Sequence, residues 1–398
     1  MKLILLTLVA LPLFSKAFAA DDLPANAFPA DAFAAIFFSE NAFPTNTFAE
    51  ESTAAANKDT VYQSSYSVLP FVSYTPETSL MFGGLSLHQF KPGDAGPETR
   101  SSSFIFSAMY TLNRQLMIEF TPNVIFPQER WILDGRYEFS IFPESYWGVG
   151  SETADDDELE IEYSSFDFRQ SVLRKLGPDL FAGPKLRWNR VYDISVEEPE
   201  NNTASDAGNN AVEQTTLAGI GFSVRQDRRN SIATPAQGRY LELTAMFYPD
   251  ISGATHPHSS WRMDARRYLD LSGDQSQVLA IHFRSQLTTG QLPFREYALL
   301  GGREIMRGYY EGRFRDSNSA QIQAEFRRHA WWRIGFAVFA AAGEVWNRFE
   351  DFHLNNPKFS AGAGLRFDLN PDDTTNLRID YGISPHGGGL YITIGEAF

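Results

Sequence analysis

The chain closes with the run Leu390-Tyr391-Ile392-Thr393-Ile394-Gly395-Glu396-Ala397-Phe398. Hydrophobicity alternates along this run with a period of two, which predicts a β-strand whose two faces meet different surroundings. An aromatic residue, Phe398, stands last.

The beginning of the chain predicts export. Lys2 is followed by an apolar stretch of about a dozen residues, 3–14, which is too short to span a bilayer as a helix. Ala17-Phe18-Ala19 fits the small-x-small cleavage pattern, so residues 1–19 are interpreted as a signal peptide. An exported chain with a closing aromatic strand is typical of a bacterial outer-membrane β-barrel, which predicts location in the outer membrane of a Gram-negative-type cell.

The composition narrows the class of protein. No later segment has the roughly 18 consecutive apolar residues that a membrane helix needs, so a membrane location requires a closed barrel. The absence of cysteine excludes disulfides and thiolate metal sites. A net charge of −15 argues against nucleic acid as a partner. The aromatic share of 14% fits the aromatic girdles of barrels.

Residues 20–60 differ from the remainder of the chain. Five phenylalanines recur every five residues, a period that fits neither a helix face nor a strand face; they are Phe28, Phe33, Phe38, Phe43 and Phe48. This segment is interpreted as a low-complexity periplasmic tail, either disordered or acting as a docking segment or plug.

Residues 61–398 predict an all-β, transmembrane antiparallel barrel of about 16 strands, because alternating segments are separated by turn signals. The predicted strands are 67–75, 78–90, 101–111, 115–126, 131–142, 161–173, 179–194, 214–226, 238–248, 259–271, 276–289, 318–329, 332–345, 357–368, 374–384 and 388–398. Long gaps such as 143–160 and 290–317 follow odd-numbered strands. Most gaps after even-numbered strands are short. Such barrels have long external loops and short periplasmic turns.

The segment from Leu300 to Asp316 carries the most specific pattern, Leu-Gly-Gly-Arg-Glu-Ile-Met-Arg-Gly-Tyr-Tyr-Glu-Gly-Arg-Phe-Arg-Asp. It resembles the conserved external loop of the BamA/TamA-like outer-membrane assembly-factor superfamily, the bacterial surface antigen barrels. The resemblance implies one long external loop folded into the lumen, with an Arg-Gly-aromatic tip docked on the inner wall. The loop residues that it implies are Gly301, Gly302, Arg307, Gly308, Tyr309, Arg313 and Asp316.

Shorter pieces resemble the same family. They are the first strand and turn at 69–78, the aromatic-Gly-x-Gly strand end at 146–150, the turn at 227–238, and the closing residues 394–398. The resemblance covers residues 61–398. It implies a role in protein assembly or translocation at the outer membrane. Client outer-membrane proteins, periplasmic partner proteins, and outer-membrane lipid and lipopolysaccharide are the implied partners.

The chain departs from the family at the wall that should receive the loop. Family members usually carry an acidic residue where this chain has Ala341, two positions before Gly343. A buried guanidinium without a charge partner is costly. We therefore expect Arg307 to pair with Glu325, which alternation places on the lumen face, and to lie over the ring of Phe339.

A second departure concerns the periplasmic side. Family members typically carry polypeptide-transport-associated repeats there, each longer than the segment 20–60. The chain is expected to be a short member that lacks them. This places client handling in question, and a passive channel or structural scaffold is the alternative function.

The seam between the first and last predicted strands is expected to be the weakest pairing in the barrel. Pro70 removes a ladder donor from the first strand, and Gly388 and Gly389 weaken the last strand, which also holds Ile392, Ile394 and Phe398. In the family this seam is a lateral gate. The alternative is an ordinary edge that never opens.

Three further sets of residues bear on function. The acidic run 155–160 is either a solvated loop or a site that binds divalent cations or bridges lipopolysaccharide. Lumen-facing charges form either a paired network that anchors the loop or the selectivity lining of a pore; they are Arg262, Asp264, Arg266, Arg284, Glu325, Arg327, Arg366, Asp368, Arg378 and Asp380. None of the seven histidines lies in a nucleophile, zinc or phosphate-loop motif. No catalytic residue, metal or cofactor is therefore predicted. An outer-membrane hydrolase is the third alternative function.

Overall fold

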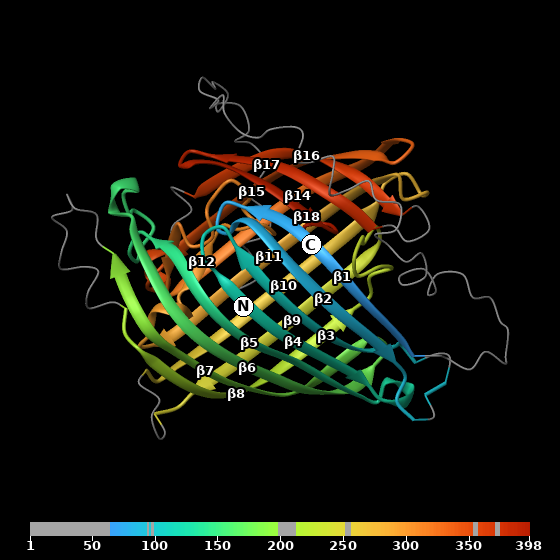
Figure 1. Ribbon diagram of the computed structural model, residues 1–398, viewed down its shortest axis with the longest axis horizontal. Coiled ribbons are helices and arrows are strands. Elements are labelled where there is room, and N and C mark those ends of the chain that lie inside the picture. The colour runs from blue at the N-terminus through green and yellow to red at the C-terminus, as the bar shows by residue number, and fades with distance from the viewer. Residues whose placement is uncertain are drawn as a thin grey trace. The chain divides into compact units, whose positions relative to one another are not determined.

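The computed structural model describes residues 64–93, 95–96, 99–197, 212–250, 256–352, 357–370 and 375–398. These residues form a closed antiparallel barrel in which sixteen strands follow one another around the wall, in the order β1 to β11 and then β14 to β18. Figure 1 shows the tilted strands, with blue β1 meeting red β18 where the barrel closes. The predicted signal peptide, 1–19, and tail, 20–60, lie outside the described residues.

The barrel strands have the bounds that follow, in chain order. They are β1 (Ser65–Thr75), β2 (Ser79–Phe90), β3 (Ser102–Thr111), β4 (Leu116–Ile125), β5 (Trp131–Tyr146), β6 (Leu159–Gly177), β7 (Leu180–Glu197), β8 (Thr215–Asp227), β9 (Gly238–Tyr248), β10 (His258–Asp270), β11 (Gln277–Gly290), β14 (Asn318–Trp331), β15 (Ile334–Trp346), β16 (Lys358–Asn370), β17 (Thr375–Ser384) and β18 (Gly387–Ile394). No helix in the described part of the chain is long and apolar enough to cross a membrane.

The two faces of the wall follow the sequence alternation. In β15, Ile334 and Val338 are exposed on the outer face, whereas Gly335, Ala337 and Phe339 are buried on the inner face. Large apolar side chains are similarly exposed on the outer faces of many other strands. This arrangement suits a wall between lipid outside and a packed interior, and it confirms the predicted fold class.

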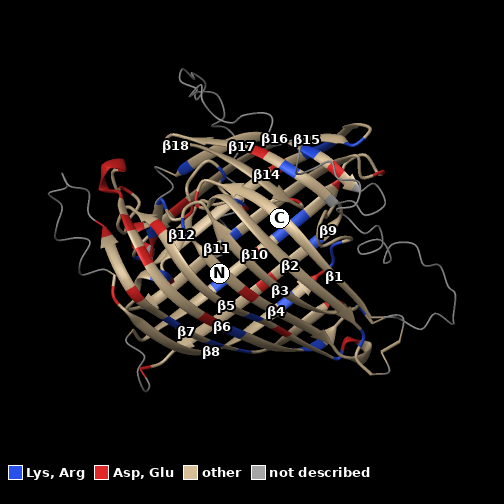
Figure 2. Ribbon diagram, in the orientation of Figure 1, with Lys and Arg blue, Asp and Glu red and all other residues tan. Residues whose placement is uncertain are grey.

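The strand boundaries differ from the prediction in places. β5 and β6 extend past the predicted ends toward the hairpin between them, where Figure 2 shows acidic residues gathered around η3 (Asp155–Asp157). The predicted loop 290–317 contains η4 (Phe294–Glu296) and a two-stranded sheet of its own, β12 (Ala298–Leu300) and β13 (Phe314–Asp316). Local pairing within a long loop satisfies backbone groups that a structureless loop would leave unpaired.

The predicted end of the last strand, 388–398, is wrong. β18 stops at Ile394, and Gly395 has φ of +85°, a backbone conformation that favours glycine. Continued alternation would have put Glu396 on the outer face beside Ile394. A carboxylate facing lipid is unfavourable, and the chain instead turns to the inner face, where Glu396 is ion-paired.

Candidate functional site

Residues 298–316 form a compact hairpin whose turns depend on glycine. β12 and β13 pair through Ala298 opposite Asp316 and Leu300 opposite Phe314. Between these strands Gly301, Gly302, Gly308 and Gly312 all have φ between +84° and +112°. An apolar cluster holds the hairpin against β15; its members are Leu300, Ile305, Met306, Tyr309, Phe314, Ala341 and Val345.

Arg307 at the tip of this hairpin is fully buried against the barrel wall. Its guanidinium donates to the carboxylates of Glu325 on β14 and Asp380 on β17. The guanidinium carbon also lies 3.6 Å from the ring centroid of Phe339 on β15, a cation–π distance. The structure thus brings the two residues expected from the sequence to Arg307 and adds Asp380, which compensates for the missing acid at Ala341.

Glycines in the wall make room for this cradle. A Cβ at Gly362 would lie 2.3 Å from the Phe339 ring, and one at Gly364 would lie 1.8 Å from the Asp380 carboxylate. At the tip, a Cβ at Gly308 would lie 2.8 Å from the backbone of β17 at Ile383. The backbone of the loop tip and the backbone of β17 therefore touch directly. The Tyr391 hydroxyl of β18 accepts a hydrogen bond from the Gly308 amide at 3.0 Å.

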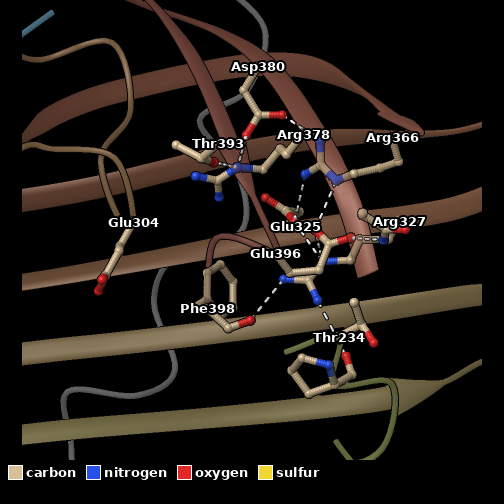
Figure 3. Close-up of polar contacts among 12 residues, drawn as sticks. Thr234, Glu304, Glu325, Arg327, Arg366, Arg378, Asp380, Thr393, Glu396 and Phe398 are labelled. Carbon is tan, nitrogen blue, oxygen red and sulfur yellow. Dashed lines mark hydrogen bonds and ion pairs between the residues drawn. The ribbon is translucent and has the colours of Figure 1, made fainter. Parts of the chain in front are cut away.

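The cradle belongs to a larger buried ion network (Figure 3). Glu325 also accepts from Arg327 at 2.6 Å and lies 3.4 Å from Arg366, while Asp380 lies 2.5 Å from Arg366. Glu396 completes the network, 2.8 Å from Arg366 and 3.4 Å from Arg327. Each carboxylate is shared between guanidiniums, so the charges compensate one another in a buried site.

Residues 395–398, which we term the latch segment, end inside this network. The Gly395 amide donates to the Asn376 carbonyl at 2.8 Å, and the Glu396 amide donates to the Ala233 carbonyl at 3.2 Å. Arg327 donates to the Phe398 carbonyl at 3.1 Å. The Phe398 ring is buried beside His282, with 4.8 Å between ring centroids. The prediction that Phe398 belongs to the seam strand is wrong, because β18 ends at Ile394 and Phe398 packs inside the barrel.

The long loop is also anchored on the opposite wall. Glu296 of η4 lies 2.7 Å from Arg187 on β7, and both side chains are buried. Arg315 donates to Glu144 on β5 at 3.3 Å. Arg313, which the resemblance assigned to the loop, lies 2.5 Å from Asp155 in the β5–β6 hairpin. The loop therefore bridges β5 and β7 on one side to β14 and β17 on the other.

The seam between β1 and β18 is held by few backbone contacts. β1 pairs with β2 along its full length, whereas its ladder with β18 consists of one residue pair, Tyr74 opposite Ile392. The Ser73 hydroxyl adds a hydrogen bond of 2.8 Å to the Ile392 carbonyl. Because β18 stops at Ile394, residues 65–71 of β1 have no partner strand on that side in the described part of the chain. This is the shortest ladder in the barrel wall.

The other predicted residues are placed as follows. Gly343 lies under Leu300, and a Cβ there would lie 3.3 Å from that side chain. Asp316 pairs with Ala298 at the base of the hairpin. Pro70 and Ile394 face outward, and a Cβ at Gly389 would lie 2.7 Å from Pro76. Gly388 pairs with Ile383 of β17.

Sequence reasoning missed the anchors contributed by distant elements. It did not connect Asp380 or Tyr391 with Arg307, nor Glu296 with Arg187. Alternation places Asp380 and Arg187 on the inner face, so the orientation of both side chains could be predicted from the sequence. Their ion-pair partners could not be predicted in this way. Within the described residues, no group of three His, Asp or Glu side chains is arranged to hold a metal ion.

The closed wall, the bridging loop and the short seam define a class, the outer-membrane β-barrels with an internal loop. The chain belongs to the Omp85 superfamily, because the model of the Omp85 superfamily domain matches residues 100–398. Barrels of this family are outer-membrane proteins, and so is this chain. A search of curated proteins found no match.

Solved structures share the fold. BamA from Haemophilus ducreyi lacking POTRA domains 1–3 is 12% identical, with a TM-score of 0.58 over 84% of this chain and 70% of that one. CdiB from Acinetobacter baumannii is 14% identical, with a TM-score of 0.53 over 83% and 59%. CdiB from Escherichia coli is 11% identical, with a TM-score of 0.54 over 82% and 62%. The chain thus spans about three fifths of the CdiB chains.

Proposed function

We propose that this barrel assembles or translocates other polypeptides at the outer membrane, and that it does so through the seam between β1 and β18. The observation that carries the proposal is the ladder of one residue pair, Tyr74 opposite Ile392. A closed barrel normally has no free strand edge. Here residues 65–71 expose backbone donors and acceptors on one side.

A free edge of this kind suits strand addition. An extended segment of a client could pair with residues 65–71, because main-chain hydrogen bonds provide affinity that does not depend on sequence. The inner face of β1 and β2 beside this edge carries apolar side chains, including Leu69, Phe71 and Leu85, which lie on one face by register. A client strand with apolar residues on both faces would be accommodated there.

The bridging loop argues against the channel alternative. Its buried ion pairs reach opposite walls, through Arg307 to Glu325 and through Glu296 to Arg187. An open pore would require both sets to break, and breaking a buried pair typically costs about 3–5 kcal/mol. The paired inner-face charges likewise support an anchoring network over a pore lining. We therefore place a passive channel or scaffold second.

The latch segment would keep the ladder between β1 and β18 short. Release of residues 395–398 would let β18 continue along β1, but continued alternation would turn Glu396 toward lipid. Docked, Glu396 lies 2.8 Å from Arg366. The ion pairs of Glu396 thus favour the state in which the edge of β1 stays free for a client.

This function requires no catalysis. The inner-face carboxylates and guanidiniums near Arg307 are committed to one another, and we infer a non-enzymatic role, with the hydrolase alternative last. Client outer-membrane proteins and periplasmic proteins are the proposed partners.

The test is to lock the seam with a disulfide between Tyr74→Cys and Ile392→Cys. Directly opposed residues suit a disulfide, and the chain has no other cysteine. The control pair is Phe106→Cys with Phe120→Cys, which are opposed across the complete β3–β4 ladder.

The readout is the amount of folded outer-membrane protein in cells that depend on each variant, under oxidising and reducing conditions. We expect the seam pair to lose function on oxidation and to regain it on reduction, whereas the control pair works in both states. A locked seam that works normally would reject lateral opening and favour the scaffold.

A further inference from the structure

Two arginines face each other on the outer wall of the barrel. Arg239, near the start of β9, is directly opposite Arg267, near the end of β10. Both side chains are exposed. Residues opposed in an antiparallel ladder have Cα atoms about 4.5–5.5 Å apart, so the two side chains leave the sheet side by side.

Register shows that both point away from the barrel interior. Along β10, Arg267 shares its face with Trp261 and Ala265, while the ion-paired Arg266 and Asp264 occupy the other face. Along β9, Arg239 likewise shares its face with apolar residues, Leu241 and Leu243 being the next two. The two guanidiniums therefore border the apolar band that faces lipid.

The pair lies at the end of the wall opposite the acidic β5–β6 hairpin. β9 begins at Gly238 and β10 ends at Asp270, where a short turn leads to β11. Short turns mark the periplasmic rim of such barrels. Arg239 and Arg267 are thus at the level where headgroups of the periplasmic leaflet meet the protein.

These two charges are not compensated within the described residues. Neither guanidinium lies within ion-pair distance of a carboxylate there, although the chain carries a net charge of −15. Arg267 donates only to the Gly238 carbonyl, at 3.4 Å. The carboxylate of Asp179 is already paired with the neighbouring Arg228, at 3.3 Å. Like charges directly opposed across a ladder are destabilising.

We propose that Arg239 and Arg267 form a binding site for the headgroup of an anionic phospholipid of the periplasmic leaflet, of the phosphatidylglycerol class. A phosphodiester carries oxygens that two planar guanidiniums can bind in a bidentate manner, which removes the like-charge repulsion. Its acyl chains would lie along Leu241 and Leu243. The site is independent of the seam and fixes the height of the β9–β10 wall in the membrane.

The experiment uses the full chain, purified in detergent and supplied with phosphatidylglycerol, phosphatidylethanolamine and lipid A in equal amounts. Native mass spectrometry measures the retained lipid. We expect preferential retention of phosphatidylglycerol. Retention of lipid A to the same extent would overturn the assignment to the periplasmic leaflet, and equal retention of phosphatidylethanolamine would show that charge does not select the lipid.

The variant Arg239→Gln with Arg267→Gln tests the residues. We expect about a fivefold loss of phosphatidylglycerol affinity per arginine, about 25-fold in all. The control, Arg190→Gln, removes an exposed outer-face arginine from the external half of β7 and should change nothing. Equal affinities of the double variant and the control would refute the site. Should the double variant fail to fold, the two single variants decide the question, and unchanged affinity in both refutes it.

Discussion

Replacing Glu325 by alanine should destabilise the docked loop and the barrel. Glu325 is fully buried and touches three guanidiniums, those of Arg307, Arg327 and Arg366. Removing one partner of a buried ion pair costs about 3–5 kcal/mol, because a charge is left uncompensated. Each arginine keeps a second carboxylate, Asp380 or Glu396. We therefore expect the lower end of that range, about 3 kcal/mol.

Gln323→Ala is the matched control. Gln323 lies two positions earlier on the same inner face of β14 and is equally buried. Its side chain donates one hydrogen bond, to the Glu304 carbonyl at 3.1 Å. Loss of one neutral hydrogen bond costs about 1 kcal/mol. The difference between the two variants should therefore be about 2 kcal/mol.

The assay is urea unfolding of the barrel in lipid vesicles, followed by β-sheet circular dichroism, with the unfolding free energy taken by linear extrapolation. Glu325→Gln, which keeps the shape of the side chain and removes its charge, separates charge from packing and should resemble Glu325→Ala. Equal losses in Glu325→Ala and Gln323→Ala would refute the reasoning. Equal losses would show that the ion pair between Arg307 and Glu325 contributes no more to the free energy of unfolding than a neutral hydrogen bond does.

Three further predictions concern the loop and the latch segment. Burial and the neighbouring carboxylate of Glu77 raise the pKa of Glu311 to about 7 from its ordinary 4.5. The docked loop therefore binds a proton more readily than the released loop, and docking should weaken as pH rises between those values. Protease cleavage of the loop measures this dependence, and Glu311→Gln should abolish it. We predict only its direction, because part of the Glu311 side chain still reaches solvent within the barrel interior. Gly308→Ala should weaken the free energy of loop docking by about 1–3 kcal/mol, since φ is +109° and the Cβ would meet β17. Faster protease cleavage of the loop would measure this loss. Phe398→Ala should cost about 3–5 kcal/mol in urea unfolding, as for other buried aromatics, and an unchanged midpoint would show that the latch segment is not docked.

The sequence predicted those features that depend on local periodicity. Alternation identified sixteen strands and their inner faces, and it placed Glu325 and Phe339 where the family-like loop requires them. Periodicity specifies which face a side chain occupies. It does not specify which strands approach one another across a closed barrel, so Asp380 was placed on the inner face without being connected to Arg307.

The end of β18 illustrates a different limit. Leu390 to Ile394 alternate as a lipid-facing strand, and the same rule continued to Phe398. Glu396 was the one sequence signal that the strand could end earlier, because it interrupts the outer apolar face two residues after Ile394. Whether such a residue ends a strand depends on a partner elsewhere, here Arg366. That partner is distant in sequence and becomes a neighbour only when the barrel closes.

The same carboxylates and guanidiniums hold both the loop and the latch segment. Arg307 of the loop and Arg366 of β16 both bind Asp380, while Arg366 also binds Glu396 of the latch segment. Withdrawal of Arg307 would leave Asp380 and Glu325 to the remaining arginines and change the charge balance around Glu396. Two sites that bias one set of buried charges are energetically coupled, and the coupling is reciprocal. Release of the latch segment would therefore also weaken loop docking, and withdrawal of Arg307 would weaken docking of the latch segment.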